Sequence, residues 1–177
     1  MNQQPWLQFR HDVVRQLAFC IASPPLLQDW PDARTPINLP QQQFWQAHFQ
    51  HYLPRLLQLD SNPAPLQQHI QQLRSTRLGI RFEGLLGFWL QDQAYHPYQL
   101  IGQSIKRMEG NRTLGELDFV LRNHETGQIE HWEVAIKFYL GEASFFAEQW
   151  VGLNRRDTLG RKLNHLQQQQ FNLHGLA

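Results

Sequence analysis

The chain has 177 residues, of which 41% are hydrophobic, and its formal net charge is +1. This length is enough for one domain of ordinary size, or for a small core with an added lobe. The near-neutral charge excludes a globally basic nucleic-acid-binding surface, so any contact with phosphate must come from a local patch. The single cysteine, Cys20, excludes an internal disulfide framework.

The sequence contains no signal for a membrane or for export. No apolar run reaches the roughly 18 residues that a transmembrane helix needs. The N-terminal segment MNQQPWLQFRHD lacks a basic region followed by an apolar core, which a signal peptide would have. We therefore expect a cytoplasmic protein with no membrane partner.

Residues 1–75 are predicted to form a helical lobe. An amphipathic helix is expected over residues 7–21, because its apolar residues fall on one stripe. A proline-rich loop follows over residues 26–40. A second helix is expected over residues 41–59, kinked or broken at Pro54, and a third over residues 65–74.

Residues 76–177 are predicted to form an α/β core. The helix expected over residues 78–91 is apolar nearly all round and should be buried, although it contains Glu83. Residues 98–107 read as a first strand, and residues 114–140 as two further strands joined by a turn. A helix from residue 154 to about residue 171 would be capped by Asn154 or by Asp157 and Thr158.

The polar face of the predicted hairpin carries charged residues whose presence needs an explanation. The turn over residues 123–128 has glycine where a short loop needs a positive φ. If Asn123 faces Gln128, then Asp118 lies opposite Glu133, with Cβ atoms roughly 4.5–5.5 Å apart. Two like charges at this distance repel unless a proton or a cation lies between them. A hard divalent cation bound by both carboxylates is the economical interpretation.

A second pairing register of the two hairpin strands is an alternative. A slip of two residues would place Asp118 opposite Ala135, and Glu116 opposite Lys137. The second of these pairs is an ordinary cross-strand ion pair. This register would weaken the argument for a metal.

The order of these residues resembles a known superfamily. Glu83, Asp118, Glu133 and Lys137, on a helix followed by a three-stranded meander, resemble the core of the PD-(D/E)XK nucleases. The segments VRQLAFCIASPPLL, RFEGLLGFWL, GELDFVL, HWEVAIKFYLG and WVGLNRRDTLGRKL resemble a bacterial domain-of-unknown-function family, number 1853, placed in that superfamily. The likeness extends from about residue 6 to the end of the chain.

The resemblance implies a restriction-endonuclease-like α-β-β-β-α core and metal-dependent hydrolysis of phosphodiester bonds in DNA or RNA. It implies that Asp118, Glu133 and Glu83 bind Mg²⁺ or Mn²⁺, which would polarise the scissile phosphate. It also implies that Lys137 positions the attacking water and stabilises the developing negative charge.

The chain departs from the superfamily pattern in two places. The usual acid lies two residues before the lysine, where this chain has Ala135, and Glu133 is about 13 Å from Lys137 along an extended strand. The core also needs one more strand after the last helix, so we expect a truncated or short form. The alternative function is therefore an inactive nuclease-like fold that binds nucleic acid or a protein.

The last predicted helix is locally basic. Arg155, Arg156, Arg161 and Lys162 are accompanied by a single acid, Asp157. This pattern suits contact with a phosphate backbone, and suits a solvated helix face equally well.

Two further interpretations complete the predictions. His124 and His131 lie near the hairpin without partners at metal-ligand spacing, so we interpret both as surface histidines. The aromatic N-terminal helices, with Trp45 and Phe49, suit a third class of function, a protein-interaction module. The oligomeric state stays open.

Overall fold

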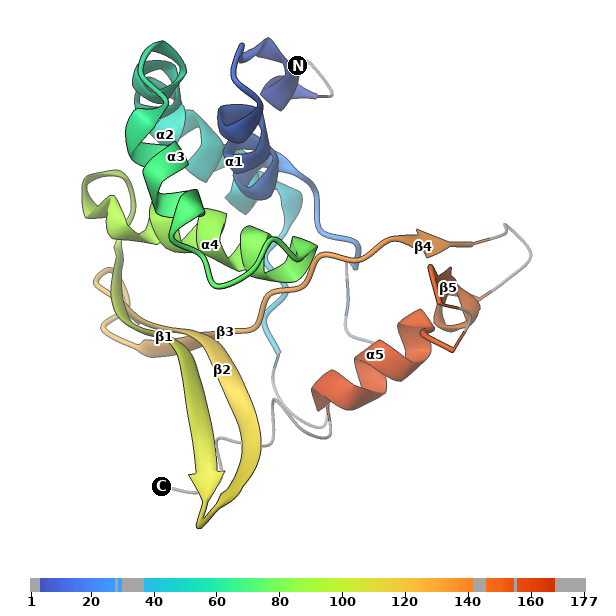
Figure 1. Cartoon of the computed structure of the whole chain (residues 1–177). Coiled ribbons are helices and arrows are strands. Elements are labelled where there is room, and N and C mark those ends of the chain that lie inside the picture. Colours follow the sequence, from blue (N-terminus) through green and yellow to red (C-terminus); the bar gives the residue numbers. More distant parts are fainter. Residues whose placement is uncertain (1–3, 28, 30–36, 142–145, 155, 168–177) are drawn as a thin grey trace. The chain divides into compact units, whose positions relative to one another are not determined.

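The computed structural model describes residues 4–27, 29, 37–141, 146–154 and 156–167 (Figure 1). The chain divides into two compact units. Unit 1 comprises Met1–Ile101 and Val120–Glu130, and unit 2 comprises Gly102–Phe119 and His131–Ala177. This is a division by packing, so the predicted sequence boundary between residues 75 and 76 stays a prediction.

The predicted mixture of helices and strands is confirmed. The described ranges hold five α-helices, a three-stranded sheet in the order β1-β2-β3 and a two-stranded sheet of β4 and β5. The chain also follows the predicted order of one helix and then three strands, since α4 precedes β1, β2 and β3. None of the helices in these ranges combines the length and apolar character that a membrane crossing requires.

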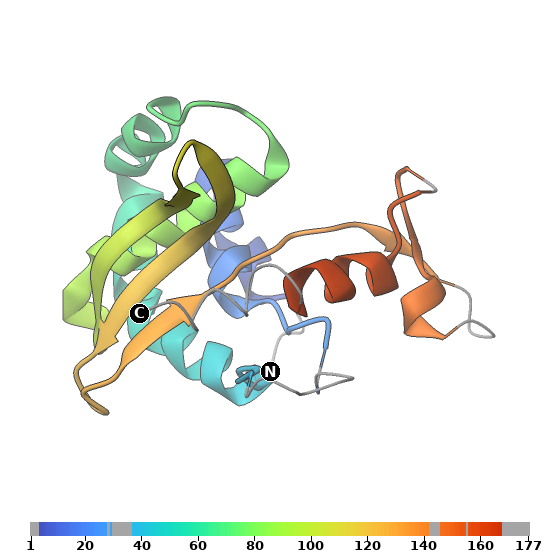
Figure 2. The same ribbon diagram turned by 90° about the horizontal axis from the view of Figure 1, so that it is seen from below.

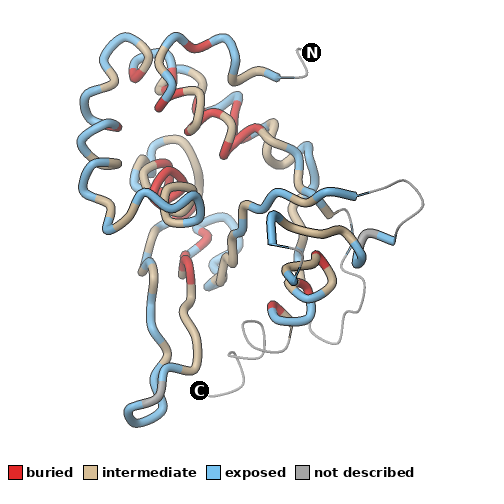
Figure 3. Tube along the Cα trace, turned by 45° about the vertical axis from the view of Figure 1, so that its right-hand side comes forward, coloured by how far each residue is buried: buried red, intermediate tan, exposed pale blue. Residues whose placement is uncertain are grey.

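Four α-helices belong to unit 1. They are α1 (Asp12–Ala22), α2 (Gln42–Ser61), α3 (Ala64–Gln71) and α4 (Leu78–Gln91), and a 3₁₀ turn, η1 (Pro5–Gln8), precedes α1. Helix α1 packs against α2 and α4, and α3 packs against α4. Figure 3 shows the buried residues of this unit gathered on its helices.

The single helix predicted over residues 7–21 is wrong, because the chain is extended between η1 and α1. The Asp60 carboxylate, at the end of α2, accepts hydrogen bonds from the backbone N–H groups of Arg10 and His11, both at 2.9 Å. These two donors are therefore satisfied without helical partners. The same contact joins the end of α2 to the start of α1.

Of the kink or break predicted at Pro54, the break is wrong, because α2 continues through Pro54 to Ser61. A proline inside a helix removes one backbone hydrogen bond and crowds the preceding turn. Here α2 buries Phe49, Tyr52 and Leu56 against its neighbours. We infer that this packing outweighs the cost of the proline.

Helix α4 spans the predicted residues, and the predicted burial holds for its second half, whereas Leu78 at its start is exposed. Gly84, Leu85, Leu86, Trp89 and Leu90 are all buried. A Cβ added at Gly84 would lie 2.6 Å from the Leu73 side chain, so the glycine allows a close approach between neighbouring segments.

A ring cluster connects α2, α4 and the first strand within unit 1. The fully buried Trp89 ring lies 5.4 Å from the His48 ring and 4.8 Å from the His96 ring, measured between centroids. His96 Nδ1 accepts the Tyr98 N–H at 3.2 Å, so Nε2 carries the proton and donates to the Trp89 carbonyl at 3.0 Å. His96 thereby fixes the start of β1 to the end of α4.

The three-stranded sheet consists of β1 (Tyr98–Glu109), β2 (Arg112–Asn123) and β3 (Ile129–Trp132), which lie side by side in Figure 2. Gly127 has φ +71° in the turn after β2, as predicted. The Asn123 N–H donates to the Gln128 carbonyl at 2.9 Å. The predicted facing of Asn123 and Gln128 is therefore confirmed.

The second strand of the predicted hairpin is much shorter than expected. Strand β3 ends at Trp132, and residues 133–138 form no helix or strand. The next strand, β4 (Tyr139–Leu140), pairs antiparallel with β5 (Val151–Gly152) instead. Glu133, Ala135 and Lys137 all lie beyond the end of β3, so neither the predicted Asp118–Glu133 pair nor the pairs of the alternative register belong to the sheet.

The last described helix, α5 (Leu159–His165), begins later than predicted. The side-chain oxygen of Thr158 accepts the Arg161 N–H at 3.2 Å, so Thr158 is the N-cap. Of the two predicted caps, the one formed by Asp157 and Thr158 is therefore confirmed at Thr158, and Asn154 is not the cap. A short 3₁₀ turn, η3 (Ala147–Gln149), packs against α5. The predicted helix end near residue 171 lies outside the described residues.

The buried histidine of the ring cluster makes the stability of unit 1 dependent on pH. Burial lowers the pKa of His48 to about 4, from the ordinary 6.5. The unfolded chain therefore takes up a proton near pH 6.5 and the folded chain does not. The free energy of unfolding should be highest above pH 6.5. It should decrease between pH 6.5 and pH 4, by at most about 1.4 kcal/mol per pH unit.

Urea unfolding followed by tryptophan fluorescence, between about pH 7.5 and pH 5, measures this dependence. His48→Phe should reduce it without abolishing it, because the ring is kept and one titrating group is lost, whereas burial also lowers the pKa of His96. His124→Gln changes an exposed turn histidine and should leave the slope unaltered. Equal slopes in wild type and His48→Phe would contradict the prediction.

Candidate functional site

Asp118 lies on β2 and is buried, with 9% of its surface exposed. Its Oδ2 accepts a hydrogen bond from the backbone N–H of Val134 at 2.9 Å. Val134 comes two residues after the end of β3. The carboxylate thus provides the acceptor at the point where the chain leaves the sheet.

Glu133 immediately follows β3, and its side chain is only 4% exposed. Its Oε2 lies 3.5 Å from Nε2 of His131, whose side chain is equally buried. The interpretation of His131 as a surface histidine is therefore wrong, whereas His124 is exposed as predicted. At 3.5 Å the two atoms are within ion-pair range but form no hydrogen bond, so among the described residues Oε2 of Glu133 is buried without one.

Lys137 pairs with Asp157, with 2.6 Å between Nζ and Oδ2. The hydrogen bond to Asp157 raises the pKa of Lys137, because it stabilises the protonated amine. The two side chains are 43% and 36% exposed. In Figure 1 the chain between β3 and β4 runs as an extended segment, and Lys137 is near its β4 end.

Glu83, the remaining predicted catalytic residue, is half-buried on α4. It belongs to unit 1, whereas Asp118, Glu133 and Lys137 belong to unit 2. The convergence of all four residues on one site stays a prediction.

The binding of Mg²⁺ or Mn²⁺ by Asp118, Glu133 and Glu83 stays a prediction. Across the described ranges, no group of three or more His, Cys, Asp or Glu side chains is arranged to hold a metal ion. Asp118 already accepts a backbone N–H, and Glu133 pairs with His131. Mg²⁺ is usually bound by one or two carboxylates together with water, and a carboxylate that accepts one N–H keeps further lone pairs, so these contacts do not decide the metal prediction.

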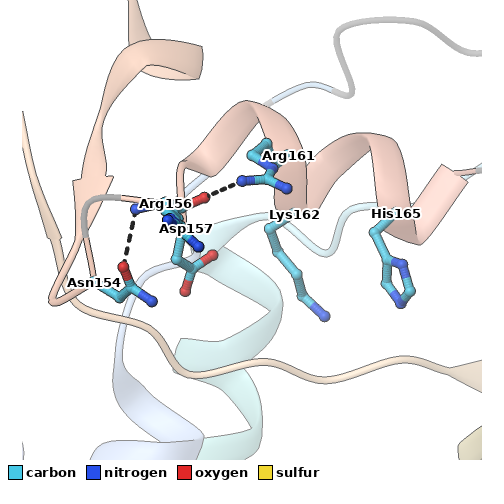
Figure 4. A pocket seen from close by; sticks show the side chains of 6 residues that line it. All are labelled: Asn154, Arg156, Asp157, Arg161, Lys162 and His165. Atoms are coloured by element: carbon cyan, nitrogen blue, oxygen red, sulfur yellow. Dashed lines mark hydrogen bonds between the residues drawn. The ribbon is translucent and has the colours of Figure 1, made fainter.

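The basic residues of the last helix do gather into one site. Arg156, Arg161 and Lys162 line a pocket of about 500 Å³ together with Asn154, Asp157 and His165 (Figure 4). Arg155, the fourth predicted cation, lies outside the described residues. Among the lining residues that the structure describes, three cations thus share the pocket with a single carboxylate.

A turn before α5 positions the pocket side chains. The Asn154 side-chain oxygen accepts the Arg156 N–H at 3.0 Å, and the Asn154 carbonyl accepts the Asp157 N–H at 2.8 Å. The Arg161 guanidinium donates to the Arg156 carbonyl at 2.5 Å. A guanidinium has five N–H donors, so this bond leaves others for an anion.

Figure 4 shows Asp157, Lys162 and His165 directed to the same side of α5. Lys162 and His165 are three residues apart, a spacing that places side chains on one helix face. An anion bound there would meet an ammonium and an imidazole from the helix, beside the carboxylate of the preceding turn.

Close contacts with η3 and the β4–β5 pair support this helix. The Leu159 N–H donates to the Trp150 carbonyl at 2.9 Å. A Cβ added at Gly160 would lie 2.9 Å from the Glu148 carbonyl oxygen, so only glycine permits this approach. The helix that carries the pocket residues is therefore held in place by packing against these neighbouring segments.

Comparison with known families decides where the chain belongs. A family model described as a domain of unknown function (DUF1853) matches residues 15–176. The chain belongs to this family. Searches among curated proteins and among solved structures gave no match.

The sequence prediction missed three pocket residues of this DUF1853 chain. Asp157 was predicted as part of a helix cap and as the lone acid of a basic segment, yet it is the partner of Lys137. Asn154 was predicted as a helix cap and instead orders the turn. His165 could have been found from its spacing of three residues from Lys162.

Loss of the Asp118 acceptor should destabilise the DUF1853 chain. Asp118→Ala leaves the Val134 N–H without its acceptor near the end of β3, at a cost of about 1–3 kcal/mol in the free energy of unfolding. Asp118→Asn retains a side-chain oxygen and should recover much of this loss. Urea unfolding followed by circular dichroism compares the variants. Equal stability of wild type and Asp118→Ala would show that the hydrogen bond contributes little.

Proposed function

We propose that this DUF1853 chain binds nucleic acid by contacting the phosphate backbone through the pocket beside α5. The observation that supports the proposal is the gathering of Arg156, Arg161 and Lys162 around one pocket. A chain with a net charge of +1 needs such a local concentration of cations to bind a polyanion.

The chemistry of the pocket suits phosphate. A guanidinium can donate two parallel hydrogen bonds to phosphate oxygens, and an ammonium acts as a compact point charge. Contacts of this kind position the backbone and do not read the bases. The proposed function is therefore binding without sequence specificity, to DNA or RNA.

We further propose that α4 and β1–β3 form a modified PD-(D/E)XK core. The order of the elements and the buried Asp118 on the middle strand support this assignment. Asp118, Glu133 and Lys137 each have a protein partner, and Ala135 occupies the usual acid position. These contacts favour the binding function over cleavage.

Neutralising the pocket cations should weaken binding. Arg156→Gln, Arg161→Gln and Lys162→Gln each remove one phosphate contact, so each should flatten the dependence of log affinity on log salt by about 0.7–0.9. Fluorescence anisotropy with labelled single-stranded DNA and RNA, over a series of salt concentrations, measures both affinity and slope.

Arg77→Gln is the matched control, because Arg77 is an exposed cation at the start of α4 in unit 1. It makes the same change in net charge outside the pocket. If all four variants weakened binding equally, the pocket would have no special role. If wild type bound neither probe, the proposed function would be wrong.

Metal-dependent hydrolysis stays a prediction from the resemblance, and calorimetry tests it. A metal site built on Asp118 and Glu133 should give saturable heat when wild type is titrated with Mn²⁺, and Asp118→Ala and Glu133→Ala should lose it. Equal and negligible heats in all three proteins would reject the metal site. This measurement is insensitive to traces of contaminating nuclease.

A further inference from the structure

Asp157 is the one carboxylate among the described residues that line the basic pocket. Its Oδ2 lies 2.6 Å from Nζ of Lys137, which comes from the segment between β3 and β4. Lys137 is therefore a further cation beside the pocket, and its charge is offset by Asp157.

The backbone holds the Asp157 carboxylate in position. The Asp157 N–H donates to the Asn154 carbonyl at 2.8 Å, and the Asp157 carbonyl accepts the Gly152 N–H at 2.6 Å. A Cβ added at Gly152 would lie 3.2 Å from the Asp157 carbonyl oxygen and 3.3 Å from its Oδ2. This close approach to β5 fixes the turn that presents Asp157.

We propose that Asp157 is a built-in counter-ion of the pocket. Its carboxylate pairs with Lys137 until a phosphate group of a nucleic acid binds to that lysine instead. The inference rests on the proposed function and adds a regulatory residue to the same site. Asp157 would then set how tightly the pocket binds a polyanion, by competing with it.

The exposure of the pair makes this exchange of partners feasible. Ion pairs between exposed side chains contribute little to stability, because solvent screens them and ordering two long side chains costs entropy. Lys137 can therefore leave Asp157 for a phosphate at small cost. Once separated, Asp157 repels the phosphate, so its carboxylate weakens binding in two ways.

A double-mutant cycle separates partner exchange from a general effect of charge. Asp157→Asn keeps the shape of the side chain and removes its charge, and should tighten binding of single-stranded oligonucleotide about fivefold. It should also steepen the salt dependence, because Lys137 gains a phosphate contact. Glu125→Gln removes an exposed carboxylate from the β2–β3 turn and measures the general effect.

Lys137→Gln provides the second arm of the cycle. If net charge alone mattered, this change would weaken binding equally in wild type and in Asp157→Asn. Partner exchange predicts a loss about threefold larger in the Asp157→Asn background, where Lys137 contacts phosphate directly. Circular dichroism and thermal melting confirm that each variant is folded.

The outcomes distinguish the counter-ion role from the proposed function. Tighter binding by Asp157→Asn than by Glu125→Gln, with unequal losses from Lys137→Gln, supports the counter-ion. Equal effects of Asp157→Asn and Glu125→Gln, or equal losses from Lys137→Gln, overturn it. If the Arg161→Gln loss persists in that case, the proposed function survives. Absence of binding in wild type and in Asp157→Asn overturns both.

Discussion

A backbone N–H that leaves a β-sheet needs a new acceptor, and Val134 finds one in the Asp118 carboxylate. This hydrogen bond holds the chain near the end of β3, so that residues 133–138 depart from the sheet towards β4. Lys137 belongs to this segment, and its side chain pairs with Asp157. The position of the lysine beside the basic pocket therefore depends on an aspartate that resembles a metal ligand in the sequence.

Local patterns predicted the elements that local interactions determine. The bounds of α4 followed from a continuous apolar stretch, and the facing of Asn123 and Gln128 followed from Gly127 in the turn. The end of β3 did not follow, because alternation of polar and apolar residues continues to Leu140. Alternation indicates an extended chain and does not say whether a neighbouring strand is present to pair with it.

The same distinction separates the two candidate sites. The pocket cations lie within seven residues of one another on a turn and a short helix, so their clustering was visible in the sequence. The metal site needs Glu83, Asp118 and Glu133 to converge from distant parts of the chain. Likewise, the partner of Lys137 is twenty residues away, and the strands between them are two residues each, too short for a periodic signal.

The partners of the acidic residues give them roles that need no metal. Asp118 orders the backbone beyond β3, Glu133 lies beside the buried His131 imidazole, and Asp157 offsets the charge of Lys137. Buried polar groups are costly unless they have partners, and each of these acids has one. The cations Arg156, Arg161 and Lys162 line a pocket, whereas Asp118 and Glu133 are buried. The polar contacts of unit 2 therefore support the proposed binding function.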